Sequence, residues 1–234
     1  MNTYPWFRMK GSISTESTGQ QSLSFCNVDR LIVDYQRPIN NDLRNRFINI
    51  QKLIVQDCEQ SFYMLIQDIV PYIDMANINT FVIGERVSEF DEDIFIQFIF
   101  SMSHLHSITM PIDLLRLLFV KCWLNINRLK ILPQRRKWSA RFTDKGFTLE
   151  EVDMLISSFN NMEQISFHSD TMPHLCEFLT NVPKRLSTLV IEHFIDNLPI
   201  GIRATETNKL LNKFKDSHRI YYKFDENQTA IVWL

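Results

Sequence analysis

The chain has 234 residues, which is enough to bury a core without disulfide bonds. Apolar residues make up 45% of it and charged residues 22%, and these values exclude an intrinsically disordered protein. With 25 Lys and Arg against 27 Asp and Glu, the formal net charge of -2 gives no general attraction to nucleic acid or to an anionic membrane.

Cysteine spacing and hydropathy indicate an intracellular protein. The four cysteines, Cys26, Cys58, Cys122 and Cys176, are far apart and form no C-x-x-C pair of the kind that binds zinc. The N-terminal residues show no signal-peptide pattern, and no stretch reaches the roughly 18 apolar residues of a membrane span. We therefore expect a cytoplasmic or nuclear protein that has no membrane partner.

Residues 1–24 are expected to form a tail and linker. An aromatic start with Tyr4, Trp6 and Phe7 is followed at 11–22 by GSISTESTGQQS, which is small, polar and without a helix or strand period. Residues 25–234 are expected to form one irregular repeat domain of about seven repeats with a C-terminal cap.

From Val28 onward one six-residue pattern recurs: an apolar residue, two variable positions, an apolar residue, one variable position and another apolar residue. It occurs seven times, at 28–33, 50–55, 78–83, 105–110, 126–131, 162–167 and 186–191. The first and last copies start 158 residues apart, so six steps give a period of about 26. The last two apolar positions lie two apart, so on a strand both point into one core and the residue between them faces the opposite side.

This pattern resembles the L-x-x-L-x-L consensus of the leucine-rich-repeat family and covers about 165 residues. The resemblance implies an α/β solenoid, a right-handed horseshoe of parallel strands with helices on its convex side. The family's Asn or Cys after the strand is matched only by Cys58, and the copies are unevenly spaced, by 21 to 36 residues. Such irregularity resembles the repeat region of F-box/leucine-rich-repeat proteins, the substrate receptors of ubiquitin ligases, although no F-box is seen.

Segments with helical spacing of apolar residues lie between the copies. They predict helices over 62–72, 94–102, 112–123, 149–159, 173–180 and 205–215. Two of these have a start signal, because Asp91 precedes one and Thr148 with Glu151 forms a capping box at another. The alternation of strands and helices indicates the α/β fold class with a parallel sheet.

The end of the chain changes character. Residues 218–224 read HRIYYKF and residues 229–234 read TAIVWL, two β-rich runs joined by a four-residue turn. We expect a β-hairpin that caps the last repeat, because a terminal repeat has to cover the core of its neighbour. Ile231 and Trp233 are expected to belong to this cap.

The strand residues between the apolar pairs are expected to line a concave face, where solenoids bind their partners. The candidate partner-binding residues there are Arg30, Ile32, Asp34, Lys52, Ile54, Gln56 and Val82. Ile32, Ile54 and Val82 would form an exposed apolar patch with a polar rim, which is typical of a protein interface. The alternative left open is that aromatic residues of the N-terminal tail cover this patch. The same columns continue through Thr109, Lys130, Ser166 and Val190, with flanking positions that include Arg128, Gln164, Thr188, His168 and Glu192.

A basic insertion follows the fifth copy. Arg135, Arg136 and Lys137 precede Trp138, and a basic run beside an aromatic residue is what phosphate contact and base stacking need. These four residues are the candidate nucleic-acid contacts. A solvated loop explains the same residues more simply, so nucleic acid is not the expected partner.

Signals for catalysis are absent from the sequence. It contains no P-loop, no dinucleotide fingerprint and no glycine elbow around a Ser or Cys. The pairs His104 with His106 and His174 with Cys176 lack further ligands, so no metal and no cofactor is expected. We expect a non-enzymatic module that binds another protein, and also a ubiquitin-ligase adaptor if an F-box lies upstream. RNA binding through 128–141, or an enzyme with a loop-borne site, are the alternative hypotheses.

Overall fold

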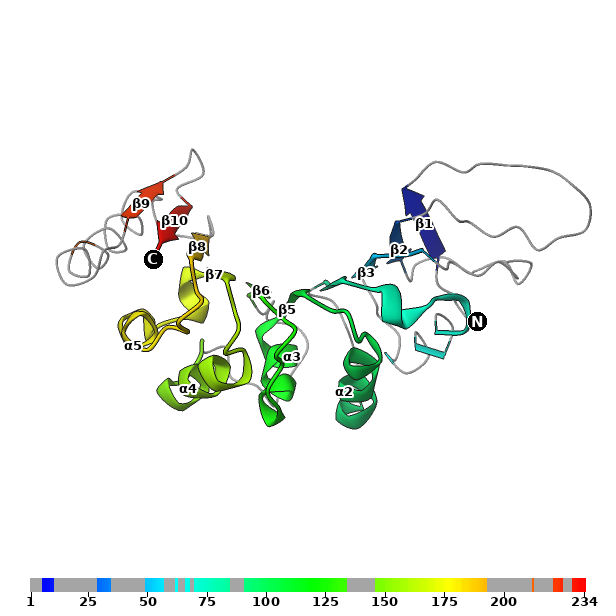
Figure 1. The fold of residues 1–234 in the computed structure, drawn as a ribbon, viewed down its shortest axis with the longest axis horizontal. Helices are drawn as coiled ribbons and strands as arrows, with labels where there is room; N and C mark the ends of the chain where they lie inside the picture. Colours follow the sequence, from blue (N-terminus) through cyan, green and yellow to red (C-terminus); the bar gives the residue numbers. More distant parts are fainter. Residues whose placement is uncertain are drawn as a thin grey trace, which may run out of the picture. The chain divides into compact units, whose positions relative to one another are not determined.

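The computed structural model describes residues 6–10, 29–34, 49–56, 62, 66–67, 70–84, 91–133, 146–192, 212, 221–224 and 229–234. Strands and helices alternate along the chain and most neighbouring strands are parallel, so the fold class is α/β, as predicted. The chain forms two units, Met1–Met110 and Pro111–Leu234, whose elements are shown in Figure 1. None of the described helices has the length and apolar character needed to cross a bilayer.

The strands of the first unit follow chain order. They are β1 (Trp6–Lys10), β2 (Arg30–Asp34), β3 (Lys52–Gln56), β4 (Thr80–Ile83) and β5 (Ser107–Pro111). β1 is antiparallel to β2, and the other neighbours are parallel. The register places Leu31, Leu53, Phe81 and Ile108 beside one another. Equivalent positions of the six-residue pattern are therefore strand neighbours.

Helical segments of the first unit pack on one face of its strands. Residues Phe62, Ile66 and Gln67 are helical, two short 3-10 helices follow at η1 (Val70–Tyr72) and η2 (Met75–Asn77), and α2 spans Glu92–Ser101. The described part of the segment expected to be a helix over 62–72 is thus helical at three residues and 3-10 at Val70–Tyr72. Asp91 caps α2 as predicted, since its carboxylate accepts the Ile94 N–H at 3.1 Å.

An aromatic cluster joins α2 to the strands. The Phe62 ring centroid lies 5.3 Å from that of Phe95 and 5.5 Å from that of Phe98, and Phe98 in turn lies 5.7 Å from Phe81 on β4. All three contacts are edge-to-face, the arrangement that aromatic quadrupoles favour. The core of this unit therefore lies between α2 and the strand face that carries Phe81.

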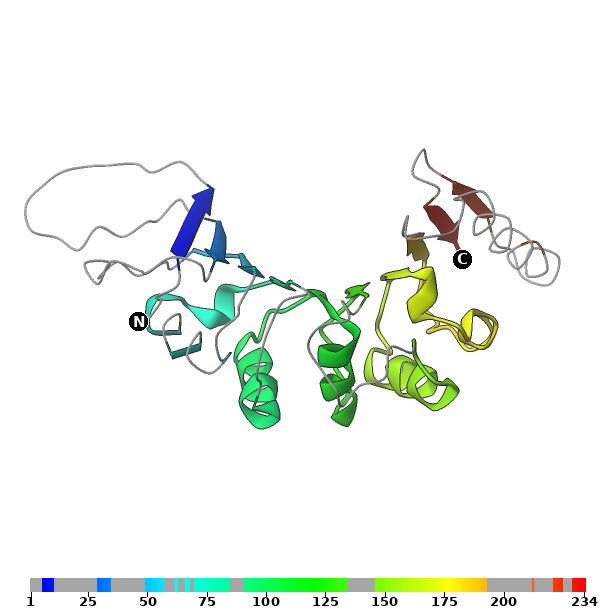
Figure 2. The same ribbon diagram turned by 180° about the vertical axis from the view of Figure 1, so that it is seen from behind.

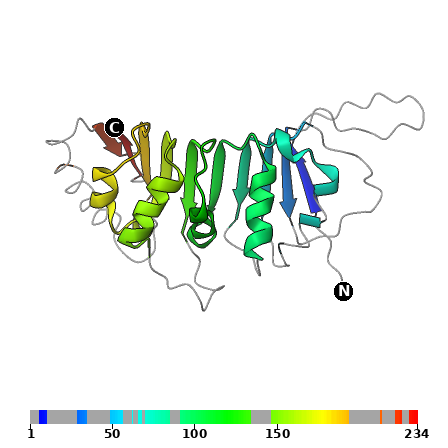
Figure 3. The same cartoon turned by 60° about the horizontal axis from the view of Figure 1, so that its bottom comes forward.

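Among its described residues, the second unit contains five strands in the spatial order β6-β7-β8-β10-β9. They are β6 (Arg128–Leu132), β7 (Gln164–His168), β8 (Thr188–Glu192), β9 (Tyr221–Phe224) and β10 (Ala230–Trp233). Its helices are α3 (Ile112–Leu117), η3 (Leu118–Val120), α4 (Leu149–Ser158), η4 (Ser169–Thr171) and α5 (Leu175–Thr180). Figures 2 and 3 show the α-helices of each unit on one side of that unit's strands.

Two predicted helices differ from the expectation. The helix expected over 112–123 stops at Leu117 and continues only as η3, while Trp123 lies in the turn before β6 and donates its indole N–H to the Leu118 carbonyl at 2.7 Å. The helix expected over 205–215 lies outside the described residues except for Asn212, which is helical. The capping box at α4 is present as predicted.

A buried turn precedes the strands and adds a position that the pattern search missed. The N–H of the first apolar residue donates to the carbonyl three residues earlier, at distances of 2.9 to 3.4 Å. The pairs are Ile78 to Met75, Leu105 to Met102, Ile126 to Trp123, Met162 to Phe159 and Leu186 to Pro183. Because the acceptor residue is buried in every one of these pairs, each of these five copies has four core positions rather than three.

The backbone repeats its hydrogen bonds from one copy to the next. The carbonyl just before a strand accepts two N–H groups from the equivalent segment of the following copy, at 2.8 to 3.2 Å. The accepting residues are Asp29, Gln51 and Asn79 in the first unit and Asn127 and Glu163 in the second. This ladder satisfies backbone groups outside the strands and makes the copies within each unit structurally equivalent.

The predicted C-terminal hairpin is present in the structure. β9 and β10 are antiparallel, and β10 also pairs antiparallel with β8, so the hairpin extends the sheet beyond the last repeat. Ala230 and Val232 are fully buried, whereas Ile231 is half-buried and Trp233 is exposed. Ile231 and Trp233 belong to this hairpin as predicted, and the register with β8 places them opposite Val190 and Thr188, on the face away from the core.

Candidate protein-binding face

Because side chains alternate along a strand, the strands of each unit have two faces, and one of them could bind a ligand. The second and third apolar residues of each pattern point toward the helices and are buried, at positions such as Leu53 and Val55 on β3 or Leu189 and Ile191 on β8. The residues between and beside them point the other way. We call this second surface, which faces away from the α-helices of its own unit, the far face.

In the first unit the structure brings the predicted binding residues together on the far face. Arg30 lies beside Lys52, Ile32 beside Ile54 and Ile54 beside Val82, and Asp34 beside Gln56. All seven residues thus occupy adjacent positions on three neighbouring parallel strands. The arrangement in columns was predicted correctly.

Of the two alternatives left open for this patch, an exposed one is contradicted at its two isoleucines. Ile32 is 6% exposed and Ile54 3% exposed, and Val82 is half-buried. Each of the two isoleucines has strand neighbours on both sides: Ile32 lies between Arg8 and Ile54, and Ile54 lies between Ile32 and Val82. The described part of the tail, Trp6–Lys10, therefore extends the sheet as a strand, and Ile32 and Ile54 have no exposed surface to offer a partner.

The far face of the second unit carries two rows of side chains that run across five strands. The first row is Arg128, Gln164, Thr188, Trp233 and Tyr221, and the second is Lys130, Ser166, Val190, Ile231 and Lys223. Trp233 is 39% exposed and Tyr221 69% exposed. Arg128 and Lys223 are also exposed, and only Ser166 among the ten is buried. We call these ten residues the Trp233 surface.

A charged hydrogen-bond network lies at one end of this surface. Lys130 Nζ lies 2.6 Å from Glu192 Oε1, and the Ser166 hydroxyl donates to the same oxygen at 3.0 Å. His168, which is buried, is the strand partner of Glu192. Because one carboxylate oxygen serves two donors, the ammonium group of Lys130 is held on the strands and much of its charge is neutralised locally.

A cation–π contact lies at the other end. The ammonium of Lys223 on β9 is 5.6 Å from the ring centroid of Trp233 on β10. Contacts of this kind stabilise by about 0.5–1 kcal/mol at exposed sites. The contact therefore favours one orientation of an exposed indole, and oriented Trp and Tyr side chains are the residue types that contribute most to protein interfaces.

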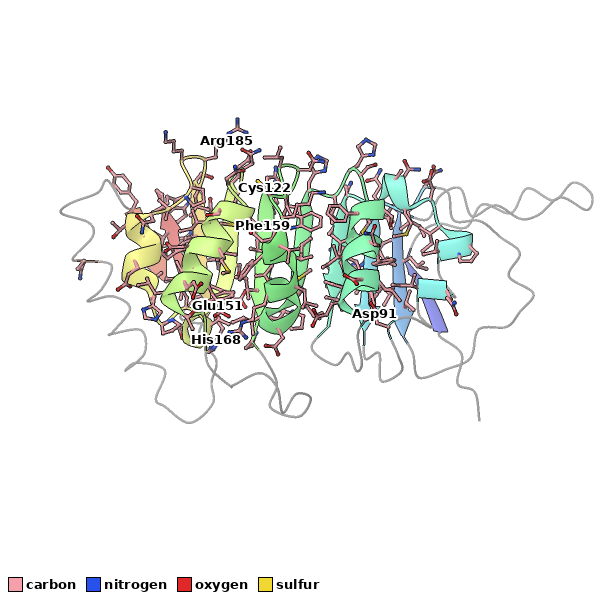
Figure 4. All side chains as sticks on the ribbon, turned by 90° about the horizontal axis from the view of Figure 1, so that it is seen from below. Asp91, Cys122, Glu151, Phe159, His168 and Arg185 are labelled. Atoms are coloured by element: carbon pink, nitrogen blue, oxygen red, sulfur yellow. The ribbon has the colours of Figure 1, made fainter. Side chains whose placement is uncertain are left out.

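The other candidate groups do not assemble into a site. Figure 4 shows His168 at the same edge of the second unit as Glu151, whereas Cys122 and Arg185 lie at the opposite edge. His104 Nδ1 lies 2.7 Å from the Ala76 carbonyl oxygen, so this ring takes part in a local backbone contact. Among the residues that the structure describes, no three His, Cys, Asp or Glu side chains are grouped as metal ligands would be.

The candidate nucleic-acid contacts Arg135, Arg136, Lys137 and Trp138 lie outside the described residues. Sequence reasoning also missed Tyr221, Lys223 and Trp233 as far-face residues. The alternation in TAIVWL shows that Ile231 and Trp233 share a face. It does not show which face, because that depends on the pairing of β10 with β8.

The fold and this face define an α/β protein in which repeated, in-register strands present a mixed aromatic and basic surface. Comparison of the chain with family models, with curated proteins and with solved structures gives no match.

Proposed function

We propose that the chain is a non-enzymatic, leucine-rich-repeat-type module that binds another protein on the Trp233 surface. The observation that carries this proposal is the pair of in-register rows on which Trp233 and Tyr221 are exposed beside basic side chains. Exposed Trp and Tyr side chains are among the residue types that contribute most binding energy at protein interfaces.

Three repeated features support the assignment to leucine-rich repeats. Equivalent apolar residues lie side by side within each unit, each described strand of β4 to β8 follows a buried turn, and a backbone ladder links successive copies. A solenoid needs this equivalence, because each copy buries its apolar face only against its neighbours. The horseshoe expected from the resemblance forms part of the proposal.

A more specific context is part of the same proposal. The uneven spacing of the copies, from 21 to 36 residues, resembles the repeats of F-box substrate receptors. The captured protein would then be a substrate for ubiquitin transfer, and an F-box upstream of the repeats would add a Skp1-type adaptor as a second partner. Capture of that adaptor together with the chain would test this extension separately.

The main proposal is tested by comparative affinity capture. The tagged full chain, a Trp233→Ala/Tyr221→Ala double variant and a Leu124→Ala control are incubated with lysate, and bound proteins are quantified by mass spectrometry. Leu124 is a matched control because it is 60% exposed and lies in the turn before β6, away from the far face.

We expect at least one protein to be retained by the wild type and the control and lost from the double variant. Circular dichroism is used to check that all three chains are folded. An identical set of bound proteins on all three folded chains would overturn the proposal, because the Trp233 surface would then make no contribution to capture.

A further inference from the structure

The chemistry of the Trp233 surface also indicates what kind of segment it binds. This inference rests on the proposed function and concerns the partner's sequence. The surface has cations at its two ends, with Arg128 and Lys130 on β6 and Lys223 on β9. Between these ends, Val190 lies on β8 and Ile231 and Trp233 lie on β10, beside the polar residues Gln164, Ser166 and Thr188.

The charges at the two ends are not fully compensated. Glu192 is paired with Lys130 at 2.6 Å and is therefore occupied. Neither Arg128 nor Lys223 has a carboxylate partner among the described residues, and both side chains are exposed. Each end of the surface consequently retains one positive charge that can attract a carboxylate of a partner.

The distance between these ends sets the length of the segment. Four strand-to-strand steps separate β6 from β9, through β7, β8 and β10. At about 4.8 Å a step, they span about 19 Å. An extended chain covers this distance with about six residues.

We infer that the Trp233 surface binds an acidic–apolar–acidic protein segment of about six extended residues that lies across the strands. Carboxylates of the segment pair with Arg128 at one end and Lys223 at the other, and apolar side chains between them pack on Trp233, Val190 and Ile231.

Single-stranded nucleic acid fits this surface less well. A nucleic-acid strand carries a negative charge at every phosphate, whereas the uncompensated cations of this surface lie only at its two ends, at Arg128 and Lys223. Glu192 places a carboxylate at the same end as Lys130 and would repel a phosphate backbone. A protein segment can place its carboxylates only at the ends, where the uncompensated cations are.

Fluorescence polarisation with two labelled peptides tests the inference. One peptide has two glutamates at each end and Ser-Ile-Leu-Ser in the centre, and the other has lysines in place of the glutamates. The full chain is compared with Lys223→Glu, Trp233→Ala and Lys184→Glu. Lys184 is the matched charge control, because it is exposed in the turn before β8 and lies outside both rows.

We expect the glutamate peptide to bind the wild type and Lys184→Glu equally. Its affinity should fall about tenfold in Lys223→Glu and at least tenfold in Trp233→Ala. Raising the salt concentration from about 0.05 M to about 0.5 M should weaken binding as well. The lysine peptide should bind more weakly than the glutamate peptide.

Equal binding of the two peptides, an equal loss in Lys184→Glu, or binding of oligothymidylate in place of the glutamate peptide would overturn the inference, as would no binding of the glutamate peptide. The result of the capture experiment separates the two proposals. A captured protein that depends on Trp233, together with no glutamate-peptide binding, leaves the proposed function standing and overturns the acidic segment alone.

Discussion

The guanidinium of Arg116 in α3 binds both carboxylate oxygens of Glu151 in the first turn of α4. Arg116 Nε lies 2.7 Å from Oε1, and Nη2 lies 3.2 Å from Oε2. The same guanidinium also contacts Asp113 at 2.9 Å and lies 5.8 Å from the centroid of the Phe147 ring. Since Glu151 Oε2 also accepts the Thr148 N–H at 2.8 Å, one arginine joins α3 to the capping box of α4.

Removal of this arginine should destabilise the second unit. The Arg116 side chain is only 13% exposed and that of Glu151 23%, so Arg116→Ala removes a cation that contacts two partly buried carboxylates, those of Asp113 and Glu151. We expect a loss of about 2 kcal/mol in the free energy of unfolding, measured by urea denaturation. Arg116→Lys should lose less, because the charge remains while the two-point geometry is lost.

The control for this prediction is Arg185→Ala. Arg185 is exposed at the opposite edge of the unit (Figure 4), so its removal should change the free energy of unfolding by less than about 0.5 kcal/mol. Equal losses in Arg116→Ala and Arg185→Ala would show that the contacts of Arg116 make no net contribution.

The same contacts make stability depend on pH. Burial acts to raise the pKa of Glu151, but hydrogen bonds from Arg116 and the Thr148 backbone outweigh it and hold the pKa below its ordinary value. A lowered folded-state pKa contributes stability that is complete above the ordinary glutamate pKa and is lost as the pH falls through the folded-state value. The difference in free energy of unfolding between wild type and Glu151→Gln should therefore be largest near neutral pH and shrink in acid. A constant difference across that range would contradict the assignment.

Introducing a charged residue into the apolar patch of the first unit, which contains Ile32, Ile54 and Val82, should lower the free energy of unfolding and so test burial and not binding. Ile54→Asp places a carboxylate at a position that is 3% exposed, and we expect a loss of 3 kcal/mol or more, roughly, in the free energy of unfolding. Val82→Asp, on the next strand of the same row, should lose clearly less, because Val82 is half-buried. The two variants are compared by urea denaturation, and equal losses would mean that the two sites are equally buried in solution.

Substitutions at two neighbouring residues of β10 test which face of the hairpin is buried. Val232 is fully buried and Ile231 is half-buried on the far face, so Val232→Asp should destabilise the chain by about 3 kcal/mol and Ile231→Asp by much less. Thermal unfolding followed by circular dichroism measures both. A larger effect at Ile231 would mean that Ile231, and not Val232, points into the core.

Features that depend only on residues close together in the chain were predicted well from the sequence. The apolar pairs of each strand are buried where they are described, because alternation along a strand is a local property. Asp91 and Thr148 begin helices as expected, since a cap needs only the next three residues. Residues at the fourth core position, such as Met102 and Phe159, are apolar in the sequence. Their place in the repeat became clear only from the turn in which their carbonyl groups accept a hydrogen bond.

The sequence by itself therefore determined the α/β class, the identity of most core residues and the columns of the far face, because spacing along the chain decides which side chains share a side of a strand. Only the tertiary structure decided which parts of that face are accessible. The pairing of β1 with β2 leaves Ile32 between two strands, and the pairing of β10 with β8 turns Trp233 outward. Both pairings join segments whose relative register the intervening chain does not specify, so the far face could be located only from the folded chain.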